Sequence, residues 1–239
     1  MEIMKKIMQK QADNFGHSGV TLAFLGDSVT QGCFEPIRKA EDRIEPVFAQ
    51  DRAYPRLVAN MLATLYPRVP INVINAGISG DGAPGGLRRL ERDVIRFDPD
   101  MVVVCFGLGD SFSGLEGIDK YVQALDGIFE RLQAANMETI FMTPSMTITR
   151  VPYAMTDPLI RNTYQRICTN QNGGVLTAYV EAAKKLCTER GIPVCDCYAK
   201  WLTMERCGVD VTDLIDGNHP KPMMHELFAI SLLETMMTV

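Results

Sequence analysis

Histidine and long apolar runs are scarce in this sequence of 239 residues. Only three histidines are present, and none lies near the Cys195-x-Cys197 pair along the chain. A zinc site needs two or more cysteine pairs at the right spacing, or histidines nearby, so we expect no metal. The longest strongly apolar stretch covers only residues 101–109. Because a membrane-spanning helix needs about 20 apolar residues, we expect no insertion into a membrane.

Basic charge is also limited. Lys and Arg number 24 against 29 Asp and Glu, which gives a formal net charge of −5 and a pI near 5.3. A protein that binds nucleic acid without regard to sequence needs a basic surface to meet the phosphates, so we expect no nucleic-acid partner. The composition, 46% hydrophobic and 22% charged, is typical of a globular protein and excludes disordered, collagen-like and coiled-coil classes.

The first residues do not have the pattern of a secretion signal. Charges interrupt the apolar residues, so no continuous apolar segment of about 7–15 residues exists. We therefore expect a cytoplasmic protein whose seven cysteines are free thiols. Ile3, Met4, Ile7 and Met8 recur at helical spacing. This spacing predicts an amphipathic extension over residues 1–15, packed on the body of the protein or on a second subunit of a homo-oligomer.

Residues 16–239 are expected to form a single domain, because no repeat or linker divides them. Five apolar runs, the last of them weaker, have the continuous pattern of parallel strands covered on both faces. They are residues 20–25, 71–74, 101–106, 139–142 and 192–195. Helical patterns alternate with them at residues 54–66, 86–97, 117–135, 174–190 and 222–237. The alternation predicts an α/β fold with a doubly wound parallel sheet.

In such a sheet, ligands bind beyond the carboxyl ends of the strands, so the loops there are the place to look for a site. Gly26-Asp27-Ser28 follows the first strand. This turn presents Ser28 and backbone N–H groups, although a serine here also serves simply to cap a helix. Glycine-rich loops follow the second strand, at residues 75–82, and the third, at residues 107–111. Neither is informative alone.

Asp216-Gly217-Asn218-His219 stands just ahead of the last helical pattern. An aspartate and a histidine three residues apart in a turn can fold together, so that the carboxylate orients one ring nitrogen and leaves the other free as a base. The same residue types also make ordinary exposed turns. Taken alone, the pair favours neither interpretation.

The four loops together are more specific than any one of them. Gly-Asp-Ser, Asn-x-Gly, Gly-x-x-Asp and Asp-x-x-His follow one another in this order. With these blocks the sequence resembles the SGNH hydrolases, also called GDSL-type esterases and lipases, from about Val20 to the last helix. The resemblance implies a three-layer α/β/α, flavodoxin-like domain with a central parallel sheet of about five strands. It also implies the hydrolysis of esters.

By resemblance, Ser28 is the nucleophile, His219 the general base and acid, and Asp216 the residue that orients His219. A serine hydroxyl attacks an acyl carbon well only when an adjacent base takes its proton, and a histidine does this near neutral pH. The aspartate fixes the tautomer and stabilises the imidazolium. Other α/β hydrolases share the order Ser, Asp, His, but they present the serine in Gly-x-Ser-x-Gly, which does not surround Ser28.

The resemblance also implies an oxyanion hole made of the Ser28 N–H, the Gly77 N–H and an asparagine side chain in the third block. Here Gly109 stands where the family has the asparagine. Loss of one donor costs about 10²–10³ in rate. Three explanations compete. Another group replaces the donor (the Gly109 N–H, the Asn75 amide or a water), the enzyme is slow and acts on activated esters, or the pocket only binds a ligand.

The expected function is a serine esterase that acts on short-chain acyl or acetyl esters, including those of carbohydrates. It forms an acyl-enzyme and needs no cofactor. Thioesters and lysophospholipids stay open as substrates, because the triad recognises the acyl carbon. The alternative functions are a ligand-binding protein without efficient catalysis and a flavodoxin-like nucleotide binder. Residues 33–52 form a charged segment that either borders the site and selects polar substrates or is an ordinary solvated loop, and residues 144–172 are a second candidate lid. His225 is expected at the surface or behind the catalytic residues.

Overall fold

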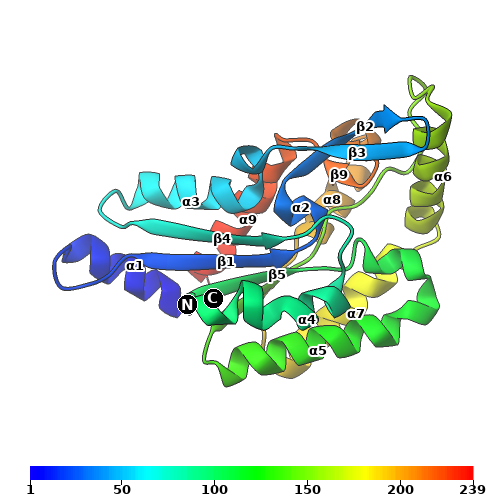
Figure 1. The fold of residues 1–239 in the computed structure, drawn as a ribbon. Helices are drawn as coiled ribbons and strands as arrows, with labels where there is room; N and C mark the ends of the chain where they lie inside the picture. Colours follow the sequence, from blue (N-terminus) through cyan, green and yellow to red (C-terminus); the bar gives the residue numbers. More distant parts are fainter. Residues whose placement is uncertain (239) are drawn as a thin grey trace.

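The central feature of the protein is a five-stranded sheet, seen in a computed structural model that describes residues 1–238 (Figure 1). Its strands, in spatial order, are β4 (Ile71–Gly77), β1 (Val20–Gly26), β5 (Met101–Cys105), β6 (Glu138–Met142) and β7 (Val194–Cys195). Every neighbouring pair is parallel. The α/β class and the five predicted strands are therefore confirmed.

Helices cover both faces of the sheet, which gives three layers (Figure 1). One face packs against α1 (Glu2–Ala12), α3 (Tyr54–Leu65), α8 (Cys197–Arg206) and α9 (Met224–Thr238). The other packs against α4 (Ala83–Asp93), α5 (Ile118–Ala134) and α7 (Val175–Arg190). Successive strand residues enter opposite cores: Phe24 lies in the first and Leu25 in the second. This is why each strand reads as a continuous apolar run.

Helix α4 differs most from its prediction, beginning at Ala83 rather than at residue 86. Pro84 occupies its first turn, where the missing N–H costs nothing. The Asp110 carboxylate accepts the Ala83 N–H at 3.0 Å, so a distant side chain satisfies a free donor of the first turn. The helix ends at Asp93, and a separate 3₁₀ turn, Ile95–Phe97, covers the rest of the predicted segment.

The N-terminal helix α1 packs on the body of the protein. Ile3, Met4 and Ile7 are buried, while Met8 is 53% exposed. The Glu138 carboxylate, at the start of β6, accepts the N–H groups of Glu2 and Ile3 at 2.8 and 2.7 Å. A negative charge at a helix N-terminus is favourable, so this contact holds α1 at the amino-terminal end of β6.

The remaining elements gather at the carboxyl ends of the strands. These are α2 (Ser28–Gln31), the hairpin β2 (Cys33–Ala40) and β3 (Arg43–Phe48), α6 (Pro158–Asn172), and the two-residue strands β8 (Ile215–Asp216) and β9 (His219–Pro220). Short 3₁₀ turns lie at Gln50–Arg52, Asp110–Ser113, Leu115–Gly117 and Val211–Leu214. The hairpin reaches α6 in Figure 1, and an ion pair of 3.0 Å joins Arg38 to Asp157 there. Within residues 1–238, no helix has the length and apolarity needed to cross a membrane.

The order of the strands determines where a site can form. From β1 the chain crosses to β4 on one side and later to β5 on the other. The loops that leave β1 and β5 therefore diverge, and the crevice between them lies at the carboxyl end of β1. Ser28 follows that end directly.

Candidate active site

Ser28 is the first residue of α2, immediately after β1. The Asp27 carboxylate caps this short helix by accepting the Val29 N–H at 3.0 Å. Gly26 permits the tight turn, because a Cβ there would lie 2.1 Å from Thr30 Oγ1 and 2.8 Å from the Cys105 carbonyl. Ser28 itself is only 7% exposed. The turn thus fixes the serine at the end of the strand with little room around it.

His219 and Ser28 meet in space although 191 residues separate them. The Nε2 atom of His219 lies 2.9 Å from Ser28 Oγ, and Nδ1 lies 2.9 Å from the carbonyl oxygen of Phe34. A carbonyl oxygen only accepts hydrogen bonds, so Nδ1 carries the hydrogen and Nε2 is the acceptor for the serine hydroxyl. Burial lowers the His219 pKa from 6.5 to about 4, against a smaller opposite effect of the Phe34 hydrogen bond. The ring is therefore neutral near pH 7, as a general base must be.

Asp216 lies opposite His219 in the β8–β9 pair. Directly opposed residues in an antiparallel pair point to the same side of the sheet. Within residues 1–238, however, the Asp216 carboxylate makes no hydrogen bond to His219, whose Nδ1 atom is bonded to Phe34 instead. Burial raises the Asp216 pKa, Lys221 opposes this and Glu35 adds to it. The motif Asp-x-x-His is thus present in space, without the hydrogen bond that the resemblance implied.

The Gly77 N–H, expected in the oxyanion hole, already has a partner. It donates to Asn75 Oδ1 at 3.0 Å, and Asn75 Nδ2 in turn donates to the Thr30 carbonyl at 2.9 Å. A Cβ on Gly77 would lie 2.3 Å from Gln31 N. In this structure, glycine at position 77 lets β4 approach α2, and the Asn75 amide holds the two together.

Gly109 is exposed and follows β5 in a right-handed backbone conformation, with φ −67° and ψ −39°. A Cβ added there would meet the Asp81 carbonyl oxygen at 3.0 Å, so the loop after β5 touches the loop after β4. In the part of the chain that the structure describes, the N–H groups of Ser28, Gly80 and Gly109 have no hydrogen-bond partner. They are among the free backbone donors of the turn that carries Ser28 and of the two loops beside it.

Asp27, next to Ser28, and Asp110, in the turn after β5, have strongly raised pKa values. Burial raises the pKa of Asp27 to about 7, and Asp110 and Asp81 add to the effect. Burial also raises the pKa of Asp110 to about 6, although its carboxylate accepts the N–H groups of Ala83 and Gly107, each at 3.0 Å. Carboxyl groups with raised pKa values thus lie beside the serine and after β5.

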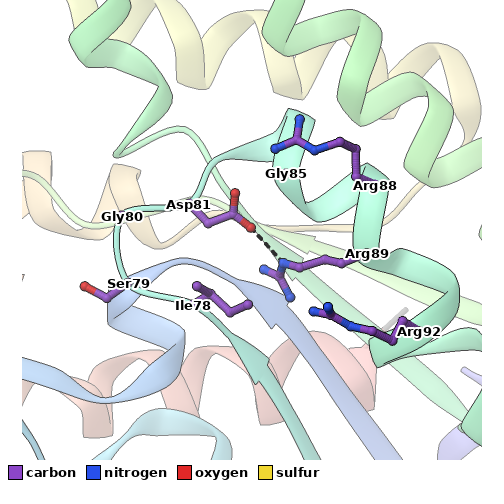
Figure 2. A pocket seen from close by; sticks show the side chains of 8 residues that line it. All are labelled: Ile78, Ser79, Gly80, Asp81, Gly85, Arg88, Arg89 and Arg92. Carbon is purple, nitrogen blue, oxygen red and sulfur yellow. Dashed lines mark hydrogen bonds and ion pairs between the residues drawn. The ribbon is translucent and has the colours of Figure 1, made fainter.

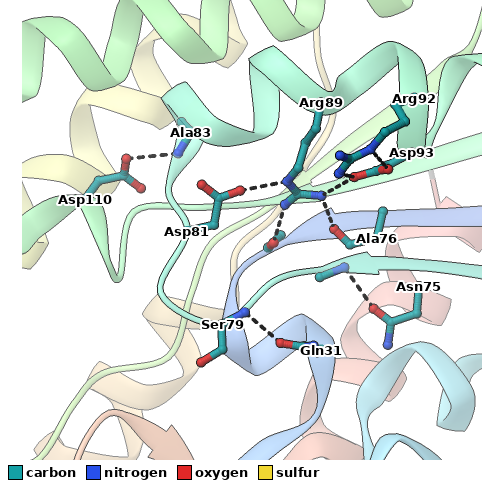
Figure 3. Close-up of polar contacts among 12 residues, drawn as sticks. Gln31, Asn75, Ala76, Ser79, Asp81, Ala83, Arg89, Arg92, Asp93 and Asp110 are labelled. Carbon is teal, nitrogen blue, oxygen red and sulfur yellow. Dashed lines mark hydrogen bonds and ion pairs between the residues drawn. The ribbon is translucent and has the colours of Figure 1, made fainter.

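Arg89, on α4, was not singled out in the sequence. Its guanidinium is 8% exposed and bonded on every side. Nε donates to Asp81 at 2.7 Å, Nη1 to the Ala76 carbonyl at 2.6 Å, and Nη2 to the Gly26 carbonyl at 2.9 Å (Figure 3). One side chain therefore ties the ends of β1 and β4 to α4. The positive charge of Arg89 does not distinguish it in the sequence, because the neighbouring Arg88 has the same charge and is exposed.

A pocket of about 460 Å³ opens between the loop after β4 and helix α4 (Figure 2). Its lining is Ile78, Ser79, Gly80, Asp81, Gly85, Arg88, Arg89 and Arg92. Ser79 and Gly80 separate this pocket from α2, to which the loop is bonded through the Ser79 N–H and Gln31 Oε1 at 2.6 Å. Neither Ser28 nor His219 lines it.

His225 is fully buried, which excludes the expected placement at the surface. Its Nδ1 accepts the Tyr54 N–H at 3.1 Å, and its ring centroid lies 5.0 Å from that of Phe34. Burial lowers its pKa to about 3, with a further contribution from His219. His225 is therefore neutral and packs against Phe34, whose carbonyl contacts His219.

Comparisons with known proteins agree with this arrangement. Residues 24–227 match the model of the GDSL-like lipase/acylhydrolase family. An acetylxylan esterase of Geobacillus stearothermophilus is 36% identical over 94 residues, which are 39% of this chain and 41% of that relative. The chain thus matches about two fifths of the length of this curated relative.

Solved structures extend the likeness to nearly the whole fold. A variant of an acetyl-xylooligosaccharide esterase from Geobacillus superposes with a TM-score of 0.68 at 25% identity, covering 91% of this chain and 94% of that one. A two-domain esterase active on acetylated mannans has a TM-score of 0.67 at 16% identity, and covers 98% of this chain and 52% of its own; this second likeness concerns the fold alone. The chain belongs to the GDSL-like lipase/acylhydrolase family.

Proposed function

We propose that this protein is a serine esterase that hydrolyses carboxylic esters through an acyl-enzyme. The observation that carries the proposal is the 2.9 Å contact between Ser28 Oγ and His219 Nε2, in a ring whose Nδ1 is already bonded to a carbonyl. A nucleophile within hydrogen-bond reach of a base that a third group orients is the arrangement needed for nucleophilic catalysis.

The reaction proceeds in two transfers. Ser28 Oγ attacks the acyl carbon as its proton moves to His219 Nε2, and a tetrahedral oxyanion forms. Collapse of this intermediate expels the alcohol, which takes the proton from His219 and leaves the acyl group on Ser28. A water molecule then attacks the acyl carbon with His219 again as base, and the acid leaves as Ser28 regains its proton.

Asp216 is the third member of the proposed triad. It lies on the same side of the β8–β9 pair as His219, so its negative charge favours the imidazolium that forms during each transfer. Burial raises the pKa of Asp216 above its ordinary value of 3.8, which makes its charged form less favourable than that of an exposed carboxyl. In the proposal, the ionised form of Asp216 contributes charge near His219.

For the oxyanion, the proposal uses the N–H groups of Ser28 and Gly109, which have no other partner among residues 1–238. Gly77 becomes a donor only if its N–H leaves Asn75. Gly80 lies in the loop that follows β4 and Gly77. Its N–H is free, and its left-handed φ of 80° suits glycine. The backbone thus supplies donors in the absence of the asparagine side chain.

The proposed substrates are acetyl or other short-chain esters, including those of carbohydrates. Ser28 is 7% exposed, which favours a small acyl group over a long one. The Geobacillus proteins described above are named acetylxylan esterase and acetyl-xylooligosaccharide esterase. The hairpin and α6, joined by Arg38 and Asp157, supply polar groups near the site for a hydroxyl-rich alcohol portion.

A second candidate function is ligand binding with little catalysis. It rests on two observations: Gly109 has no amide to donate, and the Gly77 N–H is engaged by Asn75. Both remove donors from the oxyanion, where each is worth about 10²–10³ in rate.

The test combines fluorophosphonate labelling, read by intact mass, with hydrolysis of p-nitrophenyl acetate and of acetylated xylo-oligosaccharides. We expect one label and turnover for the wild type, and neither for Ser28→Ala. Ser113→Ala is the matched control, since Ser113 is an exposed serine in the 3₁₀ turn after β5 and should behave as wild type. Folded wild type that neither labels nor turns over supports the binding function instead.

A further inference from the structure

The hydrogen-bond partner of His219 Nδ1 is a backbone carbonyl, and it does not belong to the Asp-x-x-His motif that contains His219. Phe34 is the second residue of β2, and its carbonyl oxygen lies 2.9 Å from Nδ1. The hairpin that carries it follows the nucleophile helix, whereas Asp216 lies three residues before His219. The group at the far side of the imidazole ring is thus a neutral acceptor on the hairpin.

The Phe34 carbonyl is held firmly. The Phe34 side chain is 2% exposed, with its ring 5.0 Å from His225 and the Arg52 guanidinium 5.9 Å above it. His225 is in turn fixed by the Tyr54 N–H. At the base of the hairpin, the Ala49 N–H donates to the Gly32 carbonyl at 2.9 Å. Phe34 lies in the irregular stretch of the hairpin between the pairs Cys33–Phe48 and Pro36–Pro46, so its carbonyl is held through its buried side chain and the base of the hairpin. A carbonyl anchored in this way can hold a ring in one orientation.

Asp216 has a different environment. Across residues 1–238 it has no side-chain hydrogen bond, and the charged groups that influence it are Lys221 and Glu35. The ring Nδ1 has a single hydrogen to donate, and that hydrogen is used by Phe34. Orientation of the ring and stabilisation of its charge are therefore separable here.

We propose that the main-chain carbonyl of Phe34, and not the carboxylate of Asp216, orients His219 and fixes its tautomer. The hairpin β2–β3 then acts as a positioning element for the general base, and Asp216 contributes charge alone. This inference rests on the proposed function in one respect, the role of His219 as base. Its distinguishing consequence is that loss of the Asp216 carboxylate leaves the tautomer unchanged.

The first test is Asp216→Asn, which removes the charge and keeps the shape. We expect kcat/KM on p-nitrophenyl acetate to fall by no more than about 10-fold, with KM unchanged. Asp213→Asn, an exposed neighbour, is the matched control and should behave as wild type. Where an aspartate does fix the tautomer, its replacement by asparagine costs about 10⁴ in kcat. A loss of that size in a folded variant overturns the proposal.

The second test weakens the carbonyl itself. Replacement of Glu35 by its α-hydroxy acid turns the Phe34–Glu35 amide into an ester, whose carbonyl is a poorer acceptor. We expect kcat to fall by about 10-fold or more with little change in KM, since one hydrogen bond is weakened. The same replacement at Lys39, on the exposed end of β2, is the control and should leave kcat unchanged. Equal kcat values for the two esters contradict the proposal.

The third readout does not depend on turnover. ¹⁵N and ¹H NMR of the His219 ring, assigned by comparison with His219→Ala, reports which nitrogen carries the hydrogen. We expect protonated Nδ1 in wild type, Ser28→Ala and Asp216→Asn. Conversion of Asp216→Asn to the Nε2-protonated tautomer overturns the inference. If Ser28→Ala instead keeps its activity, the proposed function fails while the tautomer result still stands by itself.

Discussion

Arg89 Nη2 donates to the carbonyl oxygen of Gly26 at 2.9 Å, although Arg89 belongs to α4 and Gly26 ends β1 (Figure 3). Gly26 is two residues before Ser28. The same guanidinium reaches the end of β4 at Ala76 and the following loop at Asp81. A single buried cation therefore connects the turn that carries the nucleophile with the loop that carries the free Gly80 N–H.

Arg89→Leu is expected to destabilise the protein and to slow catalysis. Removing one partner of a buried charged network leaves Asp81 and two carbonyls without their donor, which costs about 3–5 kcal/mol. In variants that remain folded, kcat should fall more than KM rises, because the turn and the loop move relative to one another. Chemical denaturation and steady-state kinetics measure the two effects.

Arg88→Ala provides the comparison, because Arg88 is the exposed neighbour on the same helix. Its unfolding free energy should stay within about 0.5 kcal/mol of wild type. Equal stability of the Arg89→Leu and Arg88→Ala proteins is the result that contradicts a connecting role for Arg89.

The pH profile should have its acid limb near pH 4. His219 is active as a base only when neutral, and burial lowers its pKa to about 4. kcat/KM, which reports the free enzyme, should therefore fall as the pH drops through 4. Circular dichroism at each pH separates loss of base from unfolding. A limb centred near 6.5 that persists in Asp27→Asn and Asp110→Asn, which remove the carboxyls of pKa about 7 and about 6, contradicts the burial of the ring.

Asp27→Asn should raise stability at neutral and alkaline pH. The folded-state pKa of Asp27 is about 7, above its ordinary 3.8, so the folded state binds the extra proton between these values and loses stability as the pH rises. Asparagine avoids that ionisation and still offers Oδ1 to the Val29 N–H. The gain in unfolding free energy should be a few kcal/mol at about pH 8 and should vanish near pH 4.

Asp42→Asn, an exposed acid at the tip of the hairpin, is the control and should give no such pH-dependent gain. Denaturant titrations at about pH 8 and about pH 4 measure the unfolding free energy of each variant. The prediction fails if the stability difference between Asp27→Asn and wild type is the same at both.

Gly109→Asn is expected to slow the enzyme rather than restore the missing donor. A Cβ at this position lies 3.0 Å from the Asp81 carbonyl oxygen, so the loop carrying Gly80 must move. Gly109→Ala adds the same Cβ without an amide, and the two variants should lose kcat by a similar factor of about 2–10. An asparagine variant faster than wild type shows that the amide completes the oxyanion hole.

Much of the architecture was predictable because it depends on local patterns. Strands covered on both faces read as continuous apolar runs, and their alternation with helices determined the class. The predicted helical segment 174–190 ends where α7 does, and Gly191 follows it with a left-handed φ of 65°, the usual glycine cap. Ser28 and His219 were identified through their motifs, and the structure brings them to 2.9 Å.

The contacts that were missed involve partners distant in sequence or groups that have no side chain. The Phe34 carbonyl has no sequence signature, since every residue has one. In the sequence, Arg89 is one of several basic residues of its helix. It is buried only because the ends of β1 and β4, at Gly26 and Ala76, bond to it. His225 lies six residues beyond His219, yet Tyr54 and Phe34 enclose it from a different segment. The hairpin was hidden in a charged segment with little alternation.

The 191-residue separation of Ser28 and His219 has a consequence for synthesis. Contacts between distant residues form late, because the intervening chain must close first. A nascent chain that has emerged only as far as α8 already contains the serine, the β2–β3 hairpin and Arg89, but no base. Under the proposed mechanism such an intermediate lacks its general base, and the Ser28–His219 pair is complete only when β9 has reached the hairpin. Ester hydrolysis by a nascent chain would therefore require residue 219 to have left the ribosome.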